Sequence, residues 1–292
     1  MTQPYQTLRD LLRHAVTRFN TEGLFFGHGN SSAYDEAAYL ILHTLKLPLD
    51  KLDPFLDARL LPEEISDVLA MIDRRTSERL PAAYLTNEAW LTDYRFYVDE
   101  RVIVPRSFIA EIIPEQFQPW VTDPDAVTNV LELCTGSGCL AIMLADAFPN
   151  AQVDAVDLST DALEVAKKNV AEYELQDRIT LYHSDLYDKL PAKKYDLIVT
   201  NPPYVNSTSM STLPAEYKAE PQMALAGGDD GMDLVRRIVA GAKERLTPQG
   251  ALVVEIGNEF AYAEAAFTEL ELTWLSTSAG DEAVFLVTAE QL

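Results

Sequence analysis

Apolar residues in the first 80 positions recur at intervals of three and four, with charged residues between them. In residues 7–19 the apolar positions share one side of a helix, and arginines occupy the positions between them. Residues 35–45 and 62–75 repeat this spacing, and Pro62 suits the first position of a helix. The pattern predicts a small helical N-terminal domain over residues 1–81, with apolar faces that form its core.

Residues 82–106 follow a different pattern, in which aromatic and β-branched residues partly alternate with polar ones. Such alternation favours β-strands. Residues 99–101, Asp-Glu-Arg, are suited to a turn. We therefore expect residues 82–106 to form a β-hairpin linker between two domains.

From residue 107 to residue 292, strand and helix patterns alternate. Strands are predicted over residues 127–133, 152–156, 179–183, 195–200, 251–256, 272–277 and 283–288. Helices are predicted over residues 138–148, 161–174, 230–246 and 259–270. This alternation predicts an α/β domain with a seven-stranded, mostly parallel, doubly wound sheet. Only residues 278–282 separate the last two strands, which is too short for a parallel crossover, so we expect an antiparallel C-terminal hairpin.

The charge of the chain is unevenly distributed. Of the net charge of −23, residues 1–85 carry −3 and residues 86–292 carry −20. An acidic surface repels phosphate backbones and attracts cationic partners, although general solubility is an alternative reason for it. We expect a basic protein partner and no direct binding of nucleic acid.

The cysteines, the N-terminus and the apolar runs of the chain bear on the compartment of the protein. Cys134 and Cys139 form neither a disulfide framework nor a zinc pattern, which indicates a reducing cytoplasm and no metal site. The N-terminus lacks a basic region followed by an apolar core, so no signal peptide is expected. No apolar run approaches the length of a membrane span, so no membrane association is expected.

The tetrad Asn201-Pro202-Pro203-Tyr204 directly follows a predicted strand. Two consecutive prolines restrict the backbone and remove two N–H donors. The Asn201 side-chain oxygen and the Pro202 carbonyl can each accept one hydrogen of a planar –NH₂ group, on which Tyr204 can stack. A turn that merely ends the strand is the alternative for the tetrad alone.

A glycine-rich turn and three acidic residues lie at the predicted ends of neighbouring strands. Gly136 and Gly138 permit a tight turn with close backbone approach to a ligand. Glu132 precedes this turn, Asp157 follows the next strand and Asp185 follows the third. Open α/β sheets bind ligands at this edge, where Asp157 can accept ribose hydroxyls and Asp185 can meet an adenine amine.

The acidic rim favours a ligand that is cationic and free of phosphate. A nicotinamide dinucleotide is the rival, but its fingerprint needs a first glycine where Cys134 stands, and a pyrophosphate suits three acids poorly. S-adenosylmethionine, with its adenosine, amino acid and sulfonium, fits better. The other expected contacts to it are Cys134, Thr135, Ser137 and Asn201.

Together these features resemble the class I S-adenosylmethionine-dependent methyltransferases. The tetrad resembles those that act on planar nitrogen, either exocyclic amines of bases or the side-chain amide of glutamine. The helical N-terminal domain and residues 81–85, 104–107 and 220–231 are similar to the protein-glutamine N(5)-methyltransferase family. The resemblance covers nearly the whole chain.

That family has two groups, which methylate peptide-chain release factors or the third protein of the large ribosomal subunit. Release-factor enzymes usually have Gly in place of Cys134, and Pro-Arg-Pro-acid-Thr-Glu where residues 105–110 read Pro-Arg-Ser-Phe-Ile-Ala. This departure counts against a cofactor contact of the threonine type at Ile109. Residues 26–29, 84–90, 97–101 and 134–139 are instead similar to the ribosomal-protein group. The resemblance therefore implies a large-subunit ribosomal protein, free or in an assembly intermediate, as the partner.

The resemblance also implies a mechanism. Asn201 and Pro202 accept the two N–H groups of the glutamine amide and aim its nitrogen at the methyl group, while Pro203 and Tyr204 shape the slot. The alternatives are a release-factor methyltransferase, an amine methyltransferase on nucleic acid, and a ribosome-assembly factor without catalytic activity. Within residues 107–292, Lys and Arg cluster only in the pairs 167–168, 193–194 and 236–237, which argues against the nucleic-acid enzyme, and the intact tetrad argues against the assembly factor.

Overall fold

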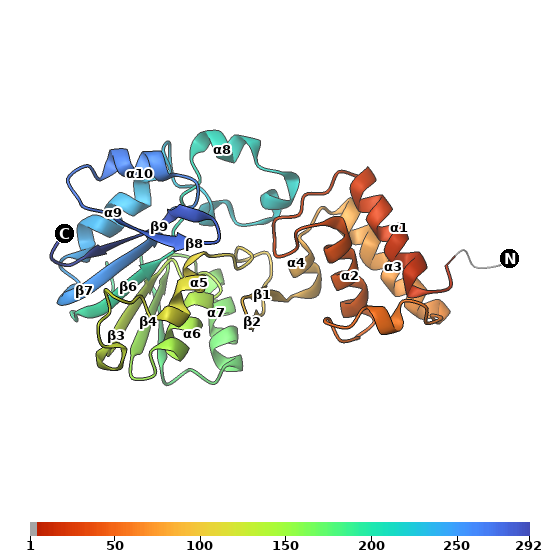
Figure 1. The fold of residues 1–292 in the computed structure, drawn as a ribbon, viewed down its shortest axis with the longest axis horizontal. Helices are drawn as coiled ribbons and strands as arrows, with labels where there is room; N and C mark the ends of the chain where they lie inside the picture. The colour runs from red at the N-terminus through yellow and green to blue at the C-terminus, as the bar shows by residue number, and fades with distance from the viewer. Residues whose placement is uncertain (1–4) are drawn as a thin grey trace. The chain divides into compact units, whose positions relative to one another are not determined.

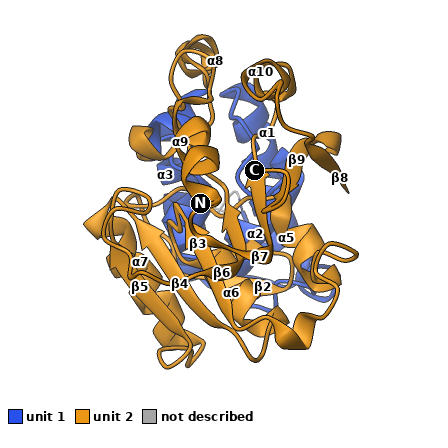
Figure 2. Cartoon of the chain, turned by 90° about the vertical axis from the view of Figure 1, so that its left-hand side faces the viewer, with its two compact units in different colours: residues 1–89, 214–220 blue, residues 90–213, 221–292 orange. Residues whose placement is uncertain are grey.

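The computed structural model describes residues 5–292, which form two compact units (Figure 2). Unit 1 contains residues 1–89 and 214–220, and unit 2 contains residues 90–213 and 221–292. Residues 1–4, where the expected helical domain and the stretch considered for a signal peptide begin, lie outside the described residues. No helix in the described part of the chain is both long and apolar enough to cross a membrane.

Unit 1 is helical. Its helices are α1 (Leu8–Thr21), α2 (Ala33–Thr44), η1 (Asp53–Phe55), α3 (Pro62–Ser77), α4 (Ala82–Thr86) and η4 (Ala215–Ala219). Thr7 and Asp10 form a capping box at the start of α1, and the Ser32 side chain caps α2. The buried faces of α1, α2, α3 and α4 share one apolar core, as the spacing of apolar residues predicted.

The expected linker differs in detail from the structure. Residues 82–86 form helix α4, and the hairpin consists of the short strands β1 (Ala89–Leu91) and β2 (Tyr94–Phe96). The expected β-hairpin is therefore present, but it spans only residues 89–96 of the predicted 82–106. Residues 99–101 do turn, with the Val102 N–H donating to the Asp99 carbonyl, but no strands flank them.

Unit 2 contains the predicted seven-stranded sheet, in the order β5-β4-β3-β6-β7-β9-β8 (Figure 1). The strands are β3 (Asn129–Leu133), β4 (Gln152–Asp157), β5 (Ile179–His183), β6 (Tyr195–Thr200), β7 (Leu246–Glu255), β8 (Thr273–Thr277) and β9 (Gly280–Thr288). The first five of these pair in parallel, whereas β9 pairs antiparallel with both β7 and β8. The fold class and the antiparallel C-terminal hairpin are confirmed.

Helices cover both faces of this sheet. The helices of unit 2 are α5 (Ile109–Ile112), η2 (Ile113–Glu115), η3 (Pro124–Ala126), α6 (Cys139–Ala147), α7 (Thr160–Glu172), α8 (Ser207–Thr212), η5 (Gln222–Ala224), α9 (Asp233–Ala242) and α10 (Phe260–Ala266). Val130 packs with α5, α6 and α7 on one face, and the next residue, Leu131, packs with α9 and α10 on the other. The sheet is therefore packed between two apolar layers, one on each face, and these layers fix the positions of the strand ends.

The helix predicted over residues 230–246 is wrong at its C-terminal end. Leu246 already pairs with Tyr195 in the sheet, so α9 ends at Ala242 and β7 begins four residues later. The apolar pattern of a buried strand continues that of the helix, and periodicity alone does not mark the change.

Candidate active site

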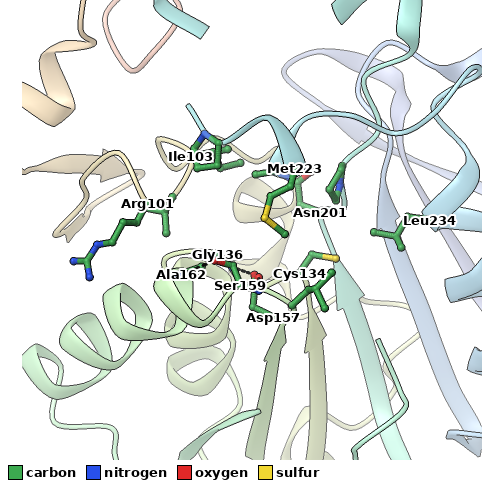
Figure 3. A pocket seen from close by; sticks show the side chains of 15 residues that line it. Arg101, Ile103, Cys134, Gly136, Asp157, Ser159, Ala162, Asn201, Met223 and Leu234 are labelled. Atoms are coloured by element: carbon green, nitrogen blue, oxygen red, sulfur yellow. Dashed lines mark hydrogen bonds between the residues drawn. The ribbon is translucent and has the colours of Figure 1, made fainter. Parts of the chain in front are cut away.

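The candidate site lies where β3, β4 and β6 end. Leu133 at the end of β3 pairs with Val156 of β4 and with Thr200 of β6, so the turns that follow these strands begin at one edge. A cavity of about 110 Å³ opens there, lined by residues from all three turns (Figure 3). Figure 3 shows Asp157 and Ser159 on one side of it, with Met223 and Asn201 opposite.

A second, smaller cavity of about 30 Å³ adjoins the first. Cys134, Gly136 and Asn201 line both, and Glu132 and Thr135 line only the smaller one. The two cavities thus bring together most of the residues that the sequence predicted. The members at the cavities are Glu132, Cys134, Thr135, Gly136, Ser137, Asp157, Asn201 and Pro203.

The glycine-rich turn presents its backbone to the larger cavity. Gly136 has φ +54°, and a Cβ atom there would meet nothing within 4 Å. Its N–H donates to Asp157 Oδ2 at 2.8 Å. Gly138 plays a different part, because its Cβ position lies 3.2 Å from Ala166 of α7 and it lines neither cavity. Glycine at 138 allows close helix packing, and glycine at 136 leaves room for a ligand.

Asp157 is held by two backbone donors. Its Oδ2 accepts from Gly136 and its Oδ1 accepts from Ser159 at 2.8 Å. Burial raises the pKa of Asp157 above its ordinary value, and the backbone N–H groups oppose that rise. Each oxygen keeps a lone pair for a ligand hydroxyl, so the carboxylate suits a ribose.

Glu132 is almost entirely buried, with 1% of its surface exposed. Burial raises its pKa to about 8, although the Thr135 hydroxyl donates to it. Asp157 nearby adds a second negative charge that raises the pKa of Glu132 further, and no salt bridge joins Glu132 to a cation among residues 5–292. The pair of acids therefore suits a cationic ligand and disfavours an anionic one, which is the fit expected of S-adenosylmethionine.

The Asn201 side chain is oriented by a backbone carbonyl. Its Nδ2 donates to the Arg106 carbonyl at 3.2 Å. This bond occupies a donor of the amide and leaves the acceptor, Oδ1, for another group. An acceptor fixed at the cavity wall can receive an N–H of a substrate amide.

Only one of the other three residues of the tetrad lies at a cavity. Pro203 lines the larger cavity, and neither Pro202 nor Tyr204 lines either cavity. The Tyr204 ring lies against Gly257, where a Cβ atom would come within 2.6 Å of it. The stacking of Tyr204 on a substrate amide stays a prediction.

Asp185 stands apart from the residues at the cavities. Its carboxylate forms an ion pair with Arg237 at 3.0 Å, and it lines neither cavity. A contact between Asp185 and adenine stays a prediction, and it requires the carboxylate to accept from the ligand as well as from Arg237.

Several residues at the cavities were not predicted from the sequence. Ile103, Leu158, Met223 and Leu234 form an apolar wall of the larger cavity. Leu158 and Met223 are 53% and 52% exposed, so the two apolar side chains on this wall are accessible to a ligand. Leu158 directly follows Asp157, and that adjacency was the one available signal for it.

Comparison with known proteins places the chain in a family. Residues 118–216 match the family described as Methyltransferase small domain. A protein named ribosomal protein uL3 glutamine methyltransferase from Burkholderia pseudomallei is 64% identical over 99% of this chain and 96% of its own length. Proteins of the same name from Bordetella pertussis and Neisseria meningitidis serogroup B are 61% and 57% identical, each over 99% of this chain and at least 95% of their own length.

The chain belongs to the family of the ribosomal protein uL3 glutamine methyltransferases. The resemblance found in the sequence motifs is thereby confirmed, and the chain is an enzyme that uses S-adenosylmethionine as methyl donor.

A solved structure supports the fold of this methyltransferase. The hMettl16 catalytic domain, crystallised with a MAT2A 3′UTR hairpin, matches with a TM-score of 0.51 and 17% identity over 87% of this chain and 91% of that chain. At this identity the match shows the class I methyltransferase fold alone.

Proposed function

We propose that this methyltransferase transfers a methyl group from S-adenosylmethionine to the side-chain amide nitrogen of a glutamine in ribosomal protein uL3. The observation that carries the proposal is the Asn201 amide, whose oxygen is left available at the cavity wall by the bond from Nδ2 to the Arg106 carbonyl. The names of the full-length relatives support the substrate.

The residues at the two cavities fit the chemical groups of the cofactor. We assign Asp157 to the ribose hydroxyls, the apolar wall with Leu158 to the adenine, and Glu132 to the ammonium group of the amino-acid end. The backbone of Gly136 allows close approach at the turn between them. When bound, S-adenosylmethionine supplies a methyl group on a positively charged sulfur, which is a good leaving group.

The amide nitrogen is a poor nucleophile because its lone pair is shared with the carbonyl. Asn201 Oδ1 and the Pro202 carbonyl accept its two N–H groups and aim the nitrogen, and in-line attack requires the reacting atoms to start about 3–3.5 Å apart. The N–C bond forms as the S–C bond breaks. The product nitrogen then loses a proton to water, so the reaction needs no dedicated base.

Charge supports a basic protein as the partner. Residues 86–292 carry a net charge of −20, which would speed the encounter with a cationic protein and oppose binding of RNA. We propose uL3, either free or in an assembling ribosomal subunit, as that partner. Such a substrate would place the reaction in the cytoplasm.

The proposed function is tested by transfer of tritiated methyl groups to a lysate from a strain that lacks the gene. We expect one labelled protein, uL3, and mass spectrometry should locate the added methyl group on a glutamine side chain. Purified release factor and purified ribosomal RNA serve as comparison substrates. Label on either of these in place of uL3 would contradict the proposal.

The raised pKa of Glu132 predicts a pH dependence of cofactor binding. Glu132 must lose its proton before it can pair with a cation, so the affinity for S-adenosylmethionine should increase as the pH rises from about 6 toward the pKa of about 8. The slope should approach a tenfold gain per pH unit. Calorimetric titration of wild type and Glu132→Gln measures it, since the variant should bind more weakly and with little dependence on pH. A wild-type affinity that stays constant over this range would exclude the role of Glu132.

A further inference from the structure

Glu255, at the carboxyl end of β7, is a buried acid with no part in the mechanism above. It is 1% exposed and lines neither cavity. Its Oε2 accepts from the Ser107 hydroxyl at 2.5 Å and from the Ile109 N–H at 3.3 Å. These partners lie almost 150 residues away along the chain, so Glu255 anchors the segment of residues 105–109 to the sheet.

This anchored segment carries the atom that orients Asn201. The Arg106 carbonyl, which accepts from Asn201 Nδ2, is one residue away from Ser107. Pro105, Arg106 and Ser107 also line the smaller cavity beside Asn201. Ser107 Oγ accepts from the Ile109 N–H as well, at 3.2 Å, which closes a tight turn directly after Arg106. A shift of this turn would move the Arg106 carbonyl and release the Asn201 amide.

Burying the Glu255 carboxylate carries a large desolvation cost. Burial raises the pKa of Glu255 to about 7, and the Ser107 hydroxyl, the neighbouring backbone N–H groups and the Arg106 charge only partly oppose that rise. A neutral side chain would satisfy a hydroxyl at less desolvation cost. In its ionised form, which dominates above a pH of about 7, the Glu255 side chain only accepts, and its bonds are about twice as strong as those between neutral groups. The ionised side chain therefore requires both the Ser107 hydroxyl and the Ile109 N–H to point toward it.

We propose that Glu255 is a positioning residue for methyl transfer, which fixes residues 105–109 so that the Arg106 carbonyl holds the Asn201 amide with its oxygen toward the substrate. This inference rests on the proposed function, because it assigns Glu255 to the same site. Glu255 acts through Ser107 and Arg106 and touches neither substrate nor cofactor.

The test compares Glu255→Ala, Ser107→Ala and the double variant with wild type. Glu255→Ala should lower kcat on uL3 by about 10- to 100-fold, because small misplacement of a reacting group has this effect. The KM for uL3 and the affinity for S-adenosylmethionine should change by less than about threefold. The double variant should be no slower than Glu255→Ala, since both single changes remove the same hydrogen bond between Ser107 and Glu255. Glu255→Gln, which keeps an acceptor, should recover part of the rate.

Asp154→Asn is the matched control. Asp154 is also a buried acid of this sheet, 3% exposed, but its partners are the Tyr195 hydroxyl at 2.8 Å and the Lys193 ammonium at 2.8 Å, near the start of β6. This variant should lose thermal stability and keep its kcat. If Glu255→Ala likewise lost stability and kept its kcat per cofactor-binding molecule, Glu255 would be merely structural.

A second readout does not depend on the substrate. In protein labelled with ¹⁵N at asparagine, the side-chain N–H of Asn201 should exchange with water at least about tenfold faster in Glu255→Ala and in Ser107→Ala than in wild type or Asp154→Asn. Unchanged exchange in both variants would overturn the positioning role. If the two variants exchange faster as expected but the wild-type enzyme does not methylate uL3, the positioning role would stand and the proposed function alone would be contradicted.

Discussion

Replacement of Asn201 by alanine is expected to slow methyl transfer about a thousandfold and to leave the affinity for S-adenosylmethionine within about threefold. Asn201 supplies an acceptor aimed at the reacting nitrogen, and loss of one such preorganised group typically reduces kcat by 10²–10³. The cofactor keeps Asp157, Glu132 and the apolar wall, none of which depends on the Asn201 side chain for a hydrogen bond. Single-turnover kinetics and calorimetry measure the two quantities separately.

Two further variants sharpen this prediction. Asn201→Asp keeps the size of the side chain but faces the Arg106 carbonyl with an acceptor in place of the Nδ2 donor, so it should also be nearly inactive. Asn129→Ala changes an asparagine at the amino end of β3, away from the site, and should retain full activity. Equal losses of turnover and cofactor binding in Asn201→Ala would show that Asn201 serves the cofactor and not the glutamine.

Replacement of Arg75 by methionine is expected to reduce the stability of unit 1 by about 3–5 kcal/mol, the usual cost of removing one partner from a buried ion pair. Arg75 is fully buried, and its guanidinium donates to Glu36 at 2.6 Å, to Glu216 at 3.4 Å and to the Phe25 carbonyl at 3.1 Å. Without it, buried Glu36 loses its cationic partner, and the remaining cation at buried Glu216 is the partly exposed Arg79 at 3.0 Å. Urea unfolding followed by circular dichroism measures the change.

The neighbouring Arg74→Met is the control. Arg74 is half-exposed and pairs with Glu78 one turn along the same helix, so this variant should lose less than about 0.5 kcal/mol. The loss in Arg75→Met should also depend on pH. Burial already raises the pKa of Glu36 with Arg75 in place, so protonation at lower pH should relieve part of the destabilisation. Similar small losses in both variants at neutral pH would contradict the view that Arg75 neutralises this cluster.

The sheet of unit 2 was predictable because its buried strands are short apolar runs bounded by turn residues. The same runs located the site, since the end of a parallel strand is also the edge where ligands bind. Glu132, Asp157 and Asn201 follow from that rule, and the structure brings them to adjoining cavities. Asp185 obeys the rule equally well and yet pairs with Arg237, because a rule on strand ends does not say which way a side chain turns.

Other features left no trace in local sequence patterns. The acceptor that orients Asn201 is the backbone carbonyl of Arg106, and every residue has a carbonyl. The bond from Ser107 to Glu255 joins residues 148 positions apart, and periodicity within a window of 18 residues carries no such information. The insertion of β9 between β7 and β8 is a matter of pairing, which strand patterns alone do not specify.

Residues 214–220 leave unit 2 after residue 213 and return to it at residue 221, although they belong to unit 1. The polypeptide therefore crosses between the two units three times, and Glu216, carried by this excursion, lies in the core cluster of Arg75. The N-terminal helices therefore cannot be exchanged as an independent module. A chimera that exchanged residues 1–89 with those of a distant homologue would separate Glu216 from Arg75, although Glu36 would be exchanged together with Arg75. Residues 1–89 and 214–220 therefore have to be inherited, and engineered, together.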